Sequence, residues 1–364
     1  MTLVEKIDFS KKAIDTWNAY NPEEKGFWMH YLGLKKTDTT VYTDFQPYTH
    51  QYTYRLTDED AARIVFCASV EIIRYNLENK MLYAIVGNSG GLDSAVTCSL
   101  LSKAAKISAD RGIPFTVTVF GMPIHSNPDH HERAEESALS FGLTYTAVDG
   151  LSDVYDMLKH IVEPISHILS FNEEEVRRGL GNIKARIRMI INFFASTKSQ
   201  SYVVSTDNLS ELYMAFWTLM GDVGAFGPIQ NVLKGLELPV VAYSLQVPAR
   251  TLGAKPTDGL NVHTSLDDQE GGDTDAFKGV TYPHLDAIIC HAVKNGLVLD
   301  KTEKVTIDRT KIDSPYATDQ IINGLIAQMV SSASVWKRTK GSIGSAVSRD
   351  DLGLPRLDIV STFL

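Results

Sequence analysis

The stretch Ser89-Gly90-Gly91-Leu92-Asp93-Ser94 joins an apolar run at residues 82–87 to a helical pattern at residues 95–106. A strand, a glycine-rich turn and a helix N-terminus together present main-chain N–H groups and the positive end of the helix dipole to an anion. The glycines allow close approach of the backbone, the serine hydroxyls can donate hydrogen bonds, and the aspartate offers a hard oxygen ligand for Mg²⁺. The stretch therefore predicts a phosphate-binding turn that also contributes to a metal site.

Two alternative roles for this turn are less well supported. A glycine-rich turn can simply cap a helix, but the complete hexapeptide between a strand and a helix favours the functional interpretation. The GxxxxGK[ST] loop is excluded, because no lysine stands at the required position.

The pattern around this turn predicts a doubly wound α/β fold. Short apolar runs at residues 82–87, 115–120, 144–148 and 202–205 are separated by helical patterns at residues 95–106, 131–141 and 181–195. Strands that alternate with helices indicate a parallel sheet with helices on both faces. We expect this domain to span residues 58–364, beginning with an amphipathic helix, and residues 1–57 to be an aromatic-rich N-terminal extension.

The helical pattern at residues 181–195 has an apolar face formed by Ile183, Ile187, Ile190 and Phe194. Their spacing places Lys184, Arg186 and Arg188 on other, more polar faces, and leaves the arginines available for a ligand. Residues from about 276 onward also look helical.

Composition narrows the class of protein. Of the 364 residues, 44% are apolar and 22% charged, as in folded globular proteins, and the formal net charge of -9 argues against a nucleic-acid-binding protein. Cys67, Cys98 and Cys290 show no CxxC spacing, so we expect a reducing, cytoplasmic location. The charged start of the chain is unlike a secretory signal and no apolar run reaches bilayer length, so we expect no membrane association.

Three polar features leave alternatives open or are set aside. His125, His130 and His131 lack metal-ligand spacing, so a role at a loop or helix start is preferred to a zinc site. Arg177 and Arg178 are expected to form surface ion pairs with the preceding glutamates. The acidic, glycine-rich residues 263–275 can equally be a solvated loop or a lid that excludes water.

The SGGxDS sequence resembles the PP-loop of the ATP pyrophosphatases, also described as adenine nucleotide alpha hydrolase-like proteins. This group includes NAD synthetase, GMP synthetase, asparagine synthetase and tRNA-modifying enzymes. The sequence has neither a basic RNA-binding module nor paired cysteines, so a tRNA-modifying enzyme is not indicated. The segments that resemble NAD synthetase in order and spacing are residues 181–189, 205–211, 221–222, 255–257 and 279–282, with Pro228, Lys234, Asp286, Lys337 and Arg338.

The resemblance implies roles for particular residues. Asp93 and Glu211 would hold Mg²⁺, and Asp93 and Lys234 would be catalytic. The residues that would bind ATP are Gly87, Ser89, Gly90, Gly91, Asp93, Ser94, Thr206, Lys234 and Thr257. Those that would bind the acid-bearing substrate are Arg186, Asp222, Trp336 and Lys337.

The resemblance also implies a reaction: ATP-dependent amidation of nicotinic acid adenine dinucleotide by ammonia, through an acyl-adenylate, with release of AMP and pyrophosphate. The same chemistry on nicotinic acid mononucleotide, or a non-catalytic nucleotide-binding protein, are the alternatives. A homodimer is implied as well. The roughly eighty residues ahead of the turn are too few for a nitrilase-like glutaminase domain, so free ammonia or a separate glutaminase partner is the expected donor.

Four positions depart from the family pattern. Leu219 stands where a lysine is usual, Ala225 and Phe226 where an aspartate is usual, Trp336 for a histidine, and Gly121 for an arginine. Loss of a charge and replacement of a polar contact by an aromatic ring change what a pocket can bind. We therefore expect an altered nicotinate side of the pocket and an intact ATP side.

Overall fold

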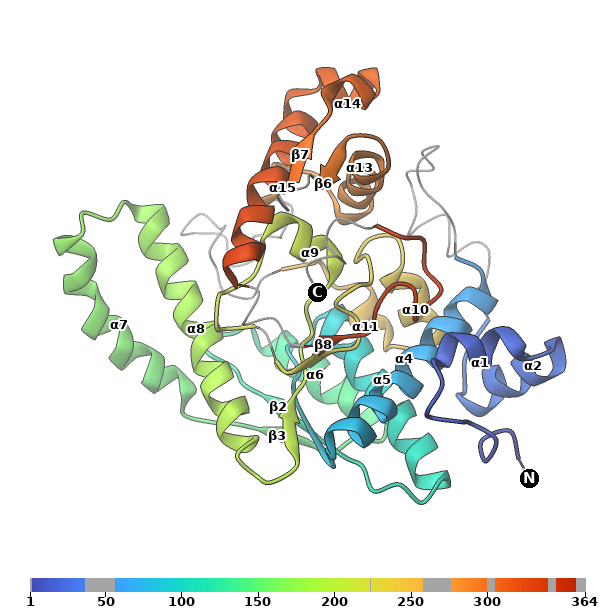
Figure 1. Ribbon diagram of the computed structural model, residues 1–364. Helices are drawn as coiled ribbons and strands as arrows, with labels where there is room; N and C mark the ends of the chain where they lie inside the picture. The colour runs from blue at the N-terminus through green and yellow to red at the C-terminus, as the bar shows by residue number, and fades with distance from the viewer. Residues whose placement is uncertain are drawn as a thin grey trace.

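The structure is a computed structural model that describes residues 2–36, 56–222, 224–257, 276–299, 305–339 and 345–357. Its helices and strands are distributed along the whole described chain (Figure 1). Their bounds are α1 Ala13–Ala19, α2 Pro22–Tyr31, α4 Asp58–Asn79, β1 Tyr83–Gly87, α5 Leu92–Asp110, β2 Thr116–Gly121, α6 Pro128–Ser140, β3 Tyr145–Ala147, α7 Leu151–Ile168, α8 Glu173–Ala195, β4 Ser201–Val203, α9 Leu209–Met214, β5 Phe226–Gly227, α10 Leu238–Ser244, α11 Ala249–Leu252, α13 Tyr282–Asn295, β6 Leu297–Leu299, β7 Val305–Ile307, the 3-10 turn η1 Arg309–Lys311, α14 Ser314–Thr318, α15 Gln320–Thr339 and β8 Ser345–Ala346.

A four-stranded parallel sheet in the order β3-β2-β1-β4 forms the centre of the fold. The middle residues of β1 are buried, as expected of a parallel strand covered on both faces. Each of the four strands lies within two residues of the bounds expected from the sequence. The predicted doubly wound α/β fold is therefore confirmed.

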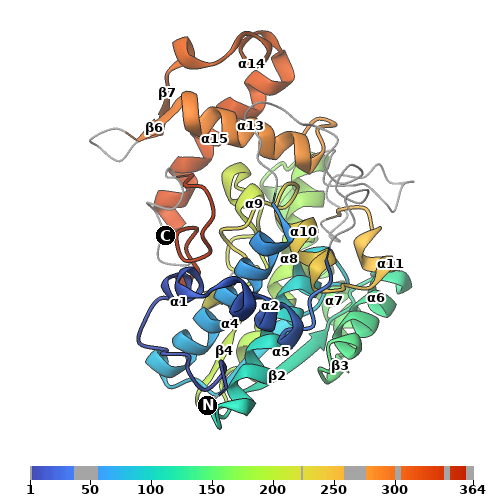
Figure 2. The same ribbon diagram turned by 90° about the vertical axis from the view of Figure 1, so that its right-hand side faces the viewer.

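Helices cover both faces of this sheet (Figures 1 and 2). α5 and α6 pack on each other and on β2, whereas α8 packs on β1 and β4. Right-handed crossovers place α5 and α6 on one face and α8 on the other, because the chain reverses direction across the sheet after β3. The carboxyl ends of β1, β2 and β4 consequently open toward the same edge of the sheet.

The N-terminal residues share the core of the α/β body. Trp17 and Trp28 are both fully buried, and their ring centroids lie 5.4 and 4.8 Å from the ring of Phe66 in α4. α4 begins at Asp58, as expected, because Thr57 and Asp60 form a capping box. The domain boundary at residue 57 stays a prediction.

A second apolar cluster lies above the sheet in Figure 1. It packs α13 and α15 on α9 and includes Phe277, Leu285 and Leu325. The helices expected after residue 276 are present, together with the antiparallel pair β6–β7 that the sequence did not indicate. Residues 263–275 lie outside the described ranges.

The C-terminal segment returns to the sheet region. β8 pairs in parallel with β5. Three residues further on, the Arg349 Nη2 atom lies 2.6 Å from Glu237 Oε1, with both side chains buried. Glu237 also accepts a hydrogen bond from the Leu233 amide. The segment after residue 345 thus holds the loop before α10 in place.

Helix α8 differs from its prediction. It begins at Glu173, where Asn172 forms a capping box, instead of near residue 181. Lys184 is only 4% exposed, because its side chain lies against the ring of Tyr155 in α7, so its predicted polar face is wrong. Ile190 and Phe194 are 64% and 75% exposed, so part of the predicted apolar face points outward.

In the part of the chain that the structure describes, no helix is long and apolar enough to cross a membrane.

Candidate active site

The turn between β1 and α5 is held open by Asn88, a residue that the sequence pattern did not single out. Its side-chain oxygen accepts hydrogen bonds from Gly90 N at 3.0 Å and Ser94 Oγ at 2.9 Å. Its amide nitrogen donates to Ala134 O at 2.9 Å in α6. Asn88 is 4% exposed, so these bonds fix the turn from below and leave its upper surface for a ligand.

The N-terminus of α5 has the features of an anion site. Gly91 is the N-cap residue and provides no side-chain cap, so the first-turn N–H groups have no side-chain acceptor of that kind. Ser89 and Ser94 hydroxyls lie 3.2 Å apart beside this end. The geometry supports the predicted phosphate-binding turn.

Gly90 is required by the backbone. Its φ of +78° is strained for other residues, and a Cβ there would lie 2.1 Å from His130 O in α6. The Gly90 carbonyl in turn accepts a hydrogen bond from Arg133 Nε. This glycine therefore lets the turn pack directly on α6.

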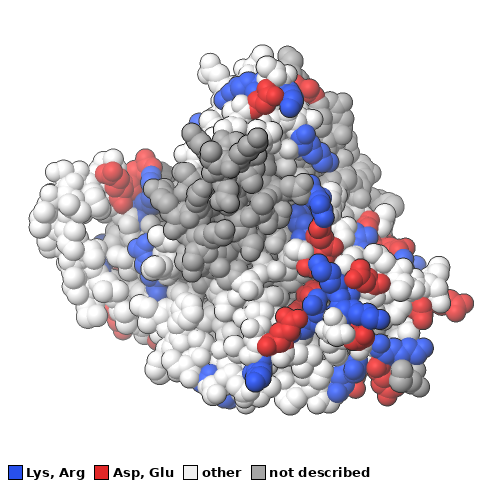
Figure 3. All heavy atoms as spheres, in the orientation of Figure 1, with Lys and Arg blue, Asp and Glu red and all other residues white. Residues whose placement is uncertain are grey.

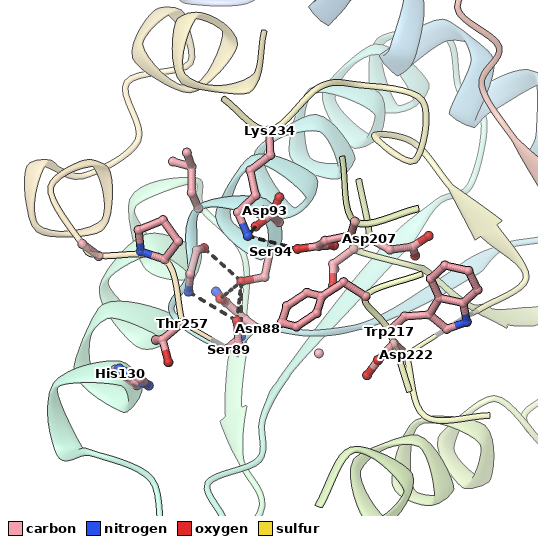
Figure 4. A pocket seen from close by; sticks show the side chains of 18 of the residues that line it. Asn88, Ser89, Asp93, Ser94, His130, Asp207, Trp217, Asp222, Lys234 and Thr257 are labelled. Carbon is pink, nitrogen blue, oxygen red and sulfur yellow. Dashed lines mark hydrogen bonds and ion pairs between the residues drawn. The ribbon is translucent and has the colours of Figure 1, made fainter. Parts of the chain in front are cut away.

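Three charged side chains meet beside the turn (Figure 4). Lys234 Nζ lies 3.0 Å from Asp93 Oδ2 and 3.0 Å from Glu211 Oε1, and all three side chains are largely buried. Asn208 links the two carboxylates: its side chain donates to Asp93 Oδ1, and its main-chain N donates to Glu211 Oε2. The structure thus brings together the two predicted metal ligands and the predicted catalytic lysine.

These carboxylates could hold a hard cation. Among the described residues, no group of three or more His, Cys, Asp or Glu side chains is arranged as a metal site. Mg²⁺ ordinarily takes one or two carboxylates and completes its shell with phosphate oxygens and water. Asp93 and Glu211 fit that donor set only when a phosphate ligand is present.

Asp286 positions the loop that carries Lys234. Its Oδ2 atom accepts from Gly235 N at 2.6 Å and Leu236 N at 3.0 Å, and its Oδ1 accepts from Ser210 Oγ at 2.5 Å. Burial raises the pKa of this carboxyl to about 7, against the hydrogen bonds that lower it. Lys234 N also donates to Ser210 Oγ, so the loop is tied to α9 and α13 together.

A cavity of about 830 Å³ lies over these groups. The predicted residues that line it are Gly87, Ser89, Gly91, Asp93, Ser94, Thr206, Glu211, Asp222, Lys234 and Thr257. Gly90 shapes the turn from behind. Within the described chain, Arg186 does not line the cavity: it is exposed, and its Nε donates to Leu219 O. Trp336 and Lys337 lie near the end of α15, and their side chains are outside the described part.

Arginines other than Arg186 face the cavity. Arg188 lines it and donates from Nε to Met122 O at 3.0 Å. Arg178 lines it as well and pairs with Glu174, as the sequence predicted for this run. Arg186, the arginine assigned to the substrate by resemblance, thus lies on the outer side of α8. Arg178 and Arg188 lie on the side that faces the cavity.

Two of the four departures from the family pattern do not alter this cavity. Phe226 belongs to β5, is 4% exposed and stacks on Tyr75 with ring centroids 4.4 Å apart. Leu219 is 44% exposed and is not part of the lining. The expectation that they change the pocket is therefore wrong for the cavity of a single chain, because one is a core residue and the other a surface residue.

Asp207 is a further buried acid at the cavity that the sequence pattern did not single out. Burial raises the pKa of its carboxyl to about 6, and Gln230 Nε2 donates to its Oδ2. Asp207 stands between Thr206 and Asn208 in the family-like segment at residues 205–211. Its position in this segment is the sequence feature that could have identified Asp207 as a site residue. The residue type alone does not show whether an acidic side chain is buried or exposed.

A glycine-rich turn at the end of a parallel strand, with two acids and a lysine beside it, is the arrangement expected of an ATP-using enzyme of the PP-loop class. Comparison with known proteins gives the family. The family model for NAD synthase matches residues 66–323, so the chain belongs to the NAD synthase family. The chain is a ligase that forms carbon–nitrogen bonds and uses ATP as co-substrate.

Relatives and solved structures agree with this assignment. The NH3-dependent NAD⁺ synthetase of Finegoldia magna is 33% identical over 241 residues, covering 65% of this chain and 88% of that protein. The NMN synthetase of Francisella tularensis has a TM-score of 0.52 at 21% identity, covering 76% of this chain and 96% of that chain. The NAD⁺ synthetase of Burkholderia pseudomallei has a TM-score of 0.54 at 17% identity, covering 83% and 95%. These two structures show the fold alone.

Asp93→Asn and Glu211→Gln should each reduce Mg-ATP-dependent pyrophosphate release by roughly a hundredfold or more, since each removes a charge facing the phosphates. Pyrophosphate release at saturating substrate checks this. Glu78→Gln, which changes a carboxylate in α4 whose side chain is 63% exposed, is the matched control and should retain full activity. Full turnover by either site variant would contradict the metal assignment.

Asp286→Asn should weaken ATP binding and destabilise the fold by about 1–3 kcal/mol, because one carboxylate oxygen becomes an NH2 group and a buried donor on that side loses its acceptor. The folded pKa of about 7 lies above the usual 3.8. The protonated carboxyl therefore stabilises the fold most below about pH 4, and this contribution is lost as pH rises through 7. Denaturant unfolding at pH 5 and pH 7.5 should show a larger penalty for the variant at pH 5. A larger penalty at pH 7.5 would mean that the carboxyl is held ionised.

Proposed function

We propose that this chain converts nicotinic acid adenine dinucleotide to NAD with ammonia and ATP, through an acyl-adenylate. The observation that carries the proposal is the cluster of Lys234 with Asp93 and Glu211 beside the phosphate-binding turn. The relative in Finegoldia magna, an NH3-dependent NAD⁺ synthetase, supports the choice of acid and nitrogen donor.

The first step activates the carboxylate. A carboxylate oxygen of the substrate attacks the α-phosphorus of ATP, the bond to the bridging oxygen breaks, and pyrophosphate leaves. Main-chain N–H groups at the start of α5 and the Lys234 ammonium stabilise the charge that develops on pyrophosphate. Ser89 and Ser94 provide hydroxyl donors at the same place.

Asp93 and Glu211 would hold Mg²⁺ in this step. The ion supplies charge neutralisation on the phosphate oxygens when it is bound. In the structure Lys234 balances the two carboxylates. We infer that this lysine turns to the phosphates when the ion and nucleotide arrive together.

The second step forms the amide. The ammonia nitrogen attacks the acyl carbon, the bond from that carbon to the AMP oxygen breaks, and AMP leaves with the electron pair while the nitrogen loses a proton. The side of the cavity that lies opposite Thr257 supplies polar contacts for the acid-bearing substrate. Asp222 lines this side, and its Oδ2 atom accepts a hydrogen bond from Thr218 N at 2.5 Å. Exclusion of water matters here, because water would hydrolyse the adenylate.

We also propose that two chains associate through α7 and α8. α7 exposes Met157, Ile161 and Ile165 on one face, each about half exposed, and Ile190 and Phe194 of α8 are exposed too. α7 is the outermost element on the left of Figure 1, with α8 between it and the sheet, and much of this side in Figure 3 is uncharged. An apolar face of this kind on a folded chain commonly marks an interface.

The position of Arg186 favours a second copy of the chain as the partner that covers the apolar face of α7 and α8. Arg186, expected to contact the dinucleotide, lies on the outer side of α8 together with Leu219. A dinucleotide reaching from the cavity to Arg186 would cross the edge of the chain there. A site completed by the second copy would explain why a single chain brings only part of the predicted residues together.

The three cysteines are free and buried, which supports a reducing, cytoplasmic location.

Purified protein with Mg-ATP and ammonium chloride should convert nicotinic acid adenine dinucleotide to NAD, with one AMP formed per amide. Chromatography of AMP and amide measures both products. Lys234→Met is the matched inactive control. Amidation of nicotinic acid mononucleotide alone would overturn the substrate, and ATP binding without AMP formation would indicate a non-catalytic protein.

Light scattering should give the mass of a dimer for the native chain. Ile161→Asp with Ile165→Asp should give a monomer that loses dinucleotide binding but keeps ATP binding, because charges cannot be buried in an apolar interface without a large cost. Leu77→Asp, at a residue of α4 that is 44% exposed, should leave the dimer intact. A monomeric native chain at assay concentration contradicts this interface.

A further inference from the structure

The cavity has two unlike sides separated by the phosphate-binding turn. In Figure 4, His130 and Thr257 lie on one side of the turn, and Trp217 and Asp222 on the other. The first side is built by the ends of β2 and β3 and by α6, and the second by the loop after α9. α8 borders both sides, because Arg188 donates to Met122 O and Asn182 accepts from Thr218 Oγ1. A nucleotide whose terminal phosphates lie at Lys234 has to place its adenosine toward one of these sides.

The Asp222 side is the one assigned to the acid-bearing substrate. It carries a carboxylate and a wall tied to α8 through Thr218 Oγ1, which donates to Asn182 Oδ1 at 2.8 Å. Adenosine therefore goes to the opposite side, over β2 and β3. The wall there contains Gly121, Met122 and Pro123, followed by His131 and Tyr145.

Tyr145 occupies the space that a side chain at position 121 would need. A Cβ built on Gly121 would lie 1.6 Å from the Tyr145 hydroxyl oxygen and 2.4 Å from its Cζ. A larger residue at position 121 would therefore displace the tyrosine. A tyrosine from the neighbouring strand therefore fills the space beside Gly121, the position where the family pattern has an arginine.

His131 fixes the orientation of that tyrosine. The Tyr145 hydroxyl lies 2.9 Å from His131 Nδ1, and the two ring centroids are 5.7 Å apart. Burial raises the pKa of Tyr145 to about 12, so the phenol is neutral near pH 7 and keeps both a proton to donate and lone pairs to accept. One of these functions is used by His131, and the other remains for a group in the cavity.

We propose that Tyr145, held by His131 over Gly121, hydrogen-bonds the adenosine part of ATP and determines nucleotide specificity. This inference rests on the proposed use of ATP at the turn. The shared chemistry is a single polar group of adenosine, either the base amino group or a ribose hydroxyl. His131 acts as a positioning residue, since its contact is to the tyrosine.

Tyr145→Phe removes the hydroxyl and keeps the ring. Calorimetric titration should show the Kd for Mg-ATP raised about 3- to 10-fold, the range of one hydrogen bond, with kcat changed less than about twofold. Titration with Mg-ITP and Mg-2′-deoxyATP identifies the group: the preference for ATP over the analogue that lacks the contacted group should fall by the same factor. Tyr83→Phe, at the opposite end of the sheet in β1, is the matched control and should leave all three Kd values unchanged.

Gly121→Ala tests the steric part, because the added Cβ displaces the tyrosine. It should weaken ATP binding at least as much as Tyr145→Phe, and should add no further loss when combined with Tyr145→Ala. Unchanged Kd values and unchanged preferences in Tyr145→Phe would overturn the inference. Because the readout is nucleotide binding, it is separate from amidation: a chain that binds ATP but amidates no nicotinate nucleotide refutes the proposed function alone, whereas one that binds no ATP refutes both.

Discussion

The bridge formed by Lys234 between Asp93 and Glu211 is the interaction on which the site depends. Two carboxylates brought this close repel each other unless a cation lies between them. The lysine ammonium meets that need at 3.0 Å from each. Removing one partner from a buried charge cluster leaves an uncompensated charge, so the three residues constrain one another. They also come from three different elements, which makes the cluster a test of the whole fold: α5, α9 and the loop before α10 must all be placed correctly.

Support for this cluster extends outward in layers. Asn88 holds the turn on one side, and Asp286 holds the Lys234 loop on the other. Asp286 does not line the cavity, whereas Asn88 lines it at the base of the turn. Both are buried polar residues whose hydrogen bonds go to main-chain groups and serine hydroxyls, and such preorganised contacts let a site stabilise developing charge without rearranging. On α8, Arg186 lies on the outer side, whereas Arg188 lines the cavity.

Much of the fold could be predicted from the sequence, because its signals are local. The four strands are short apolar runs, and the capping box at Thr57 marks the start of α4 within the chain itself. The two glycines, two serines and one aspartate of the turn are likewise contained in one hexapeptide. The start of α8 was missed because its first two turns are polar, and Lys184 was misjudged because the neighbour that buries it, Tyr155, comes from another helix. Asn88, Asp207 and Tyr145 share that difficulty: their importance arises from partners distant in sequence. The same holds for Phe226, which the family pattern places in the pocket where an aspartate is usual, whereas its ring stacks on Tyr75 in the core.

The buried pair of Arg349 with Glu237 has a consequence for the order of synthesis. Glu237 lies just after the loop that carries Lys234, and its partner is 112 positions further along the chain. Until that arginine leaves the ribosome, Glu237 has no counter-ion and the loop lacks its final anchor. A nascent chain can assemble the sheet and the phosphate turn early, yet the loop that carries Lys234 gains this anchor only after the segment around Arg349 has been synthesised.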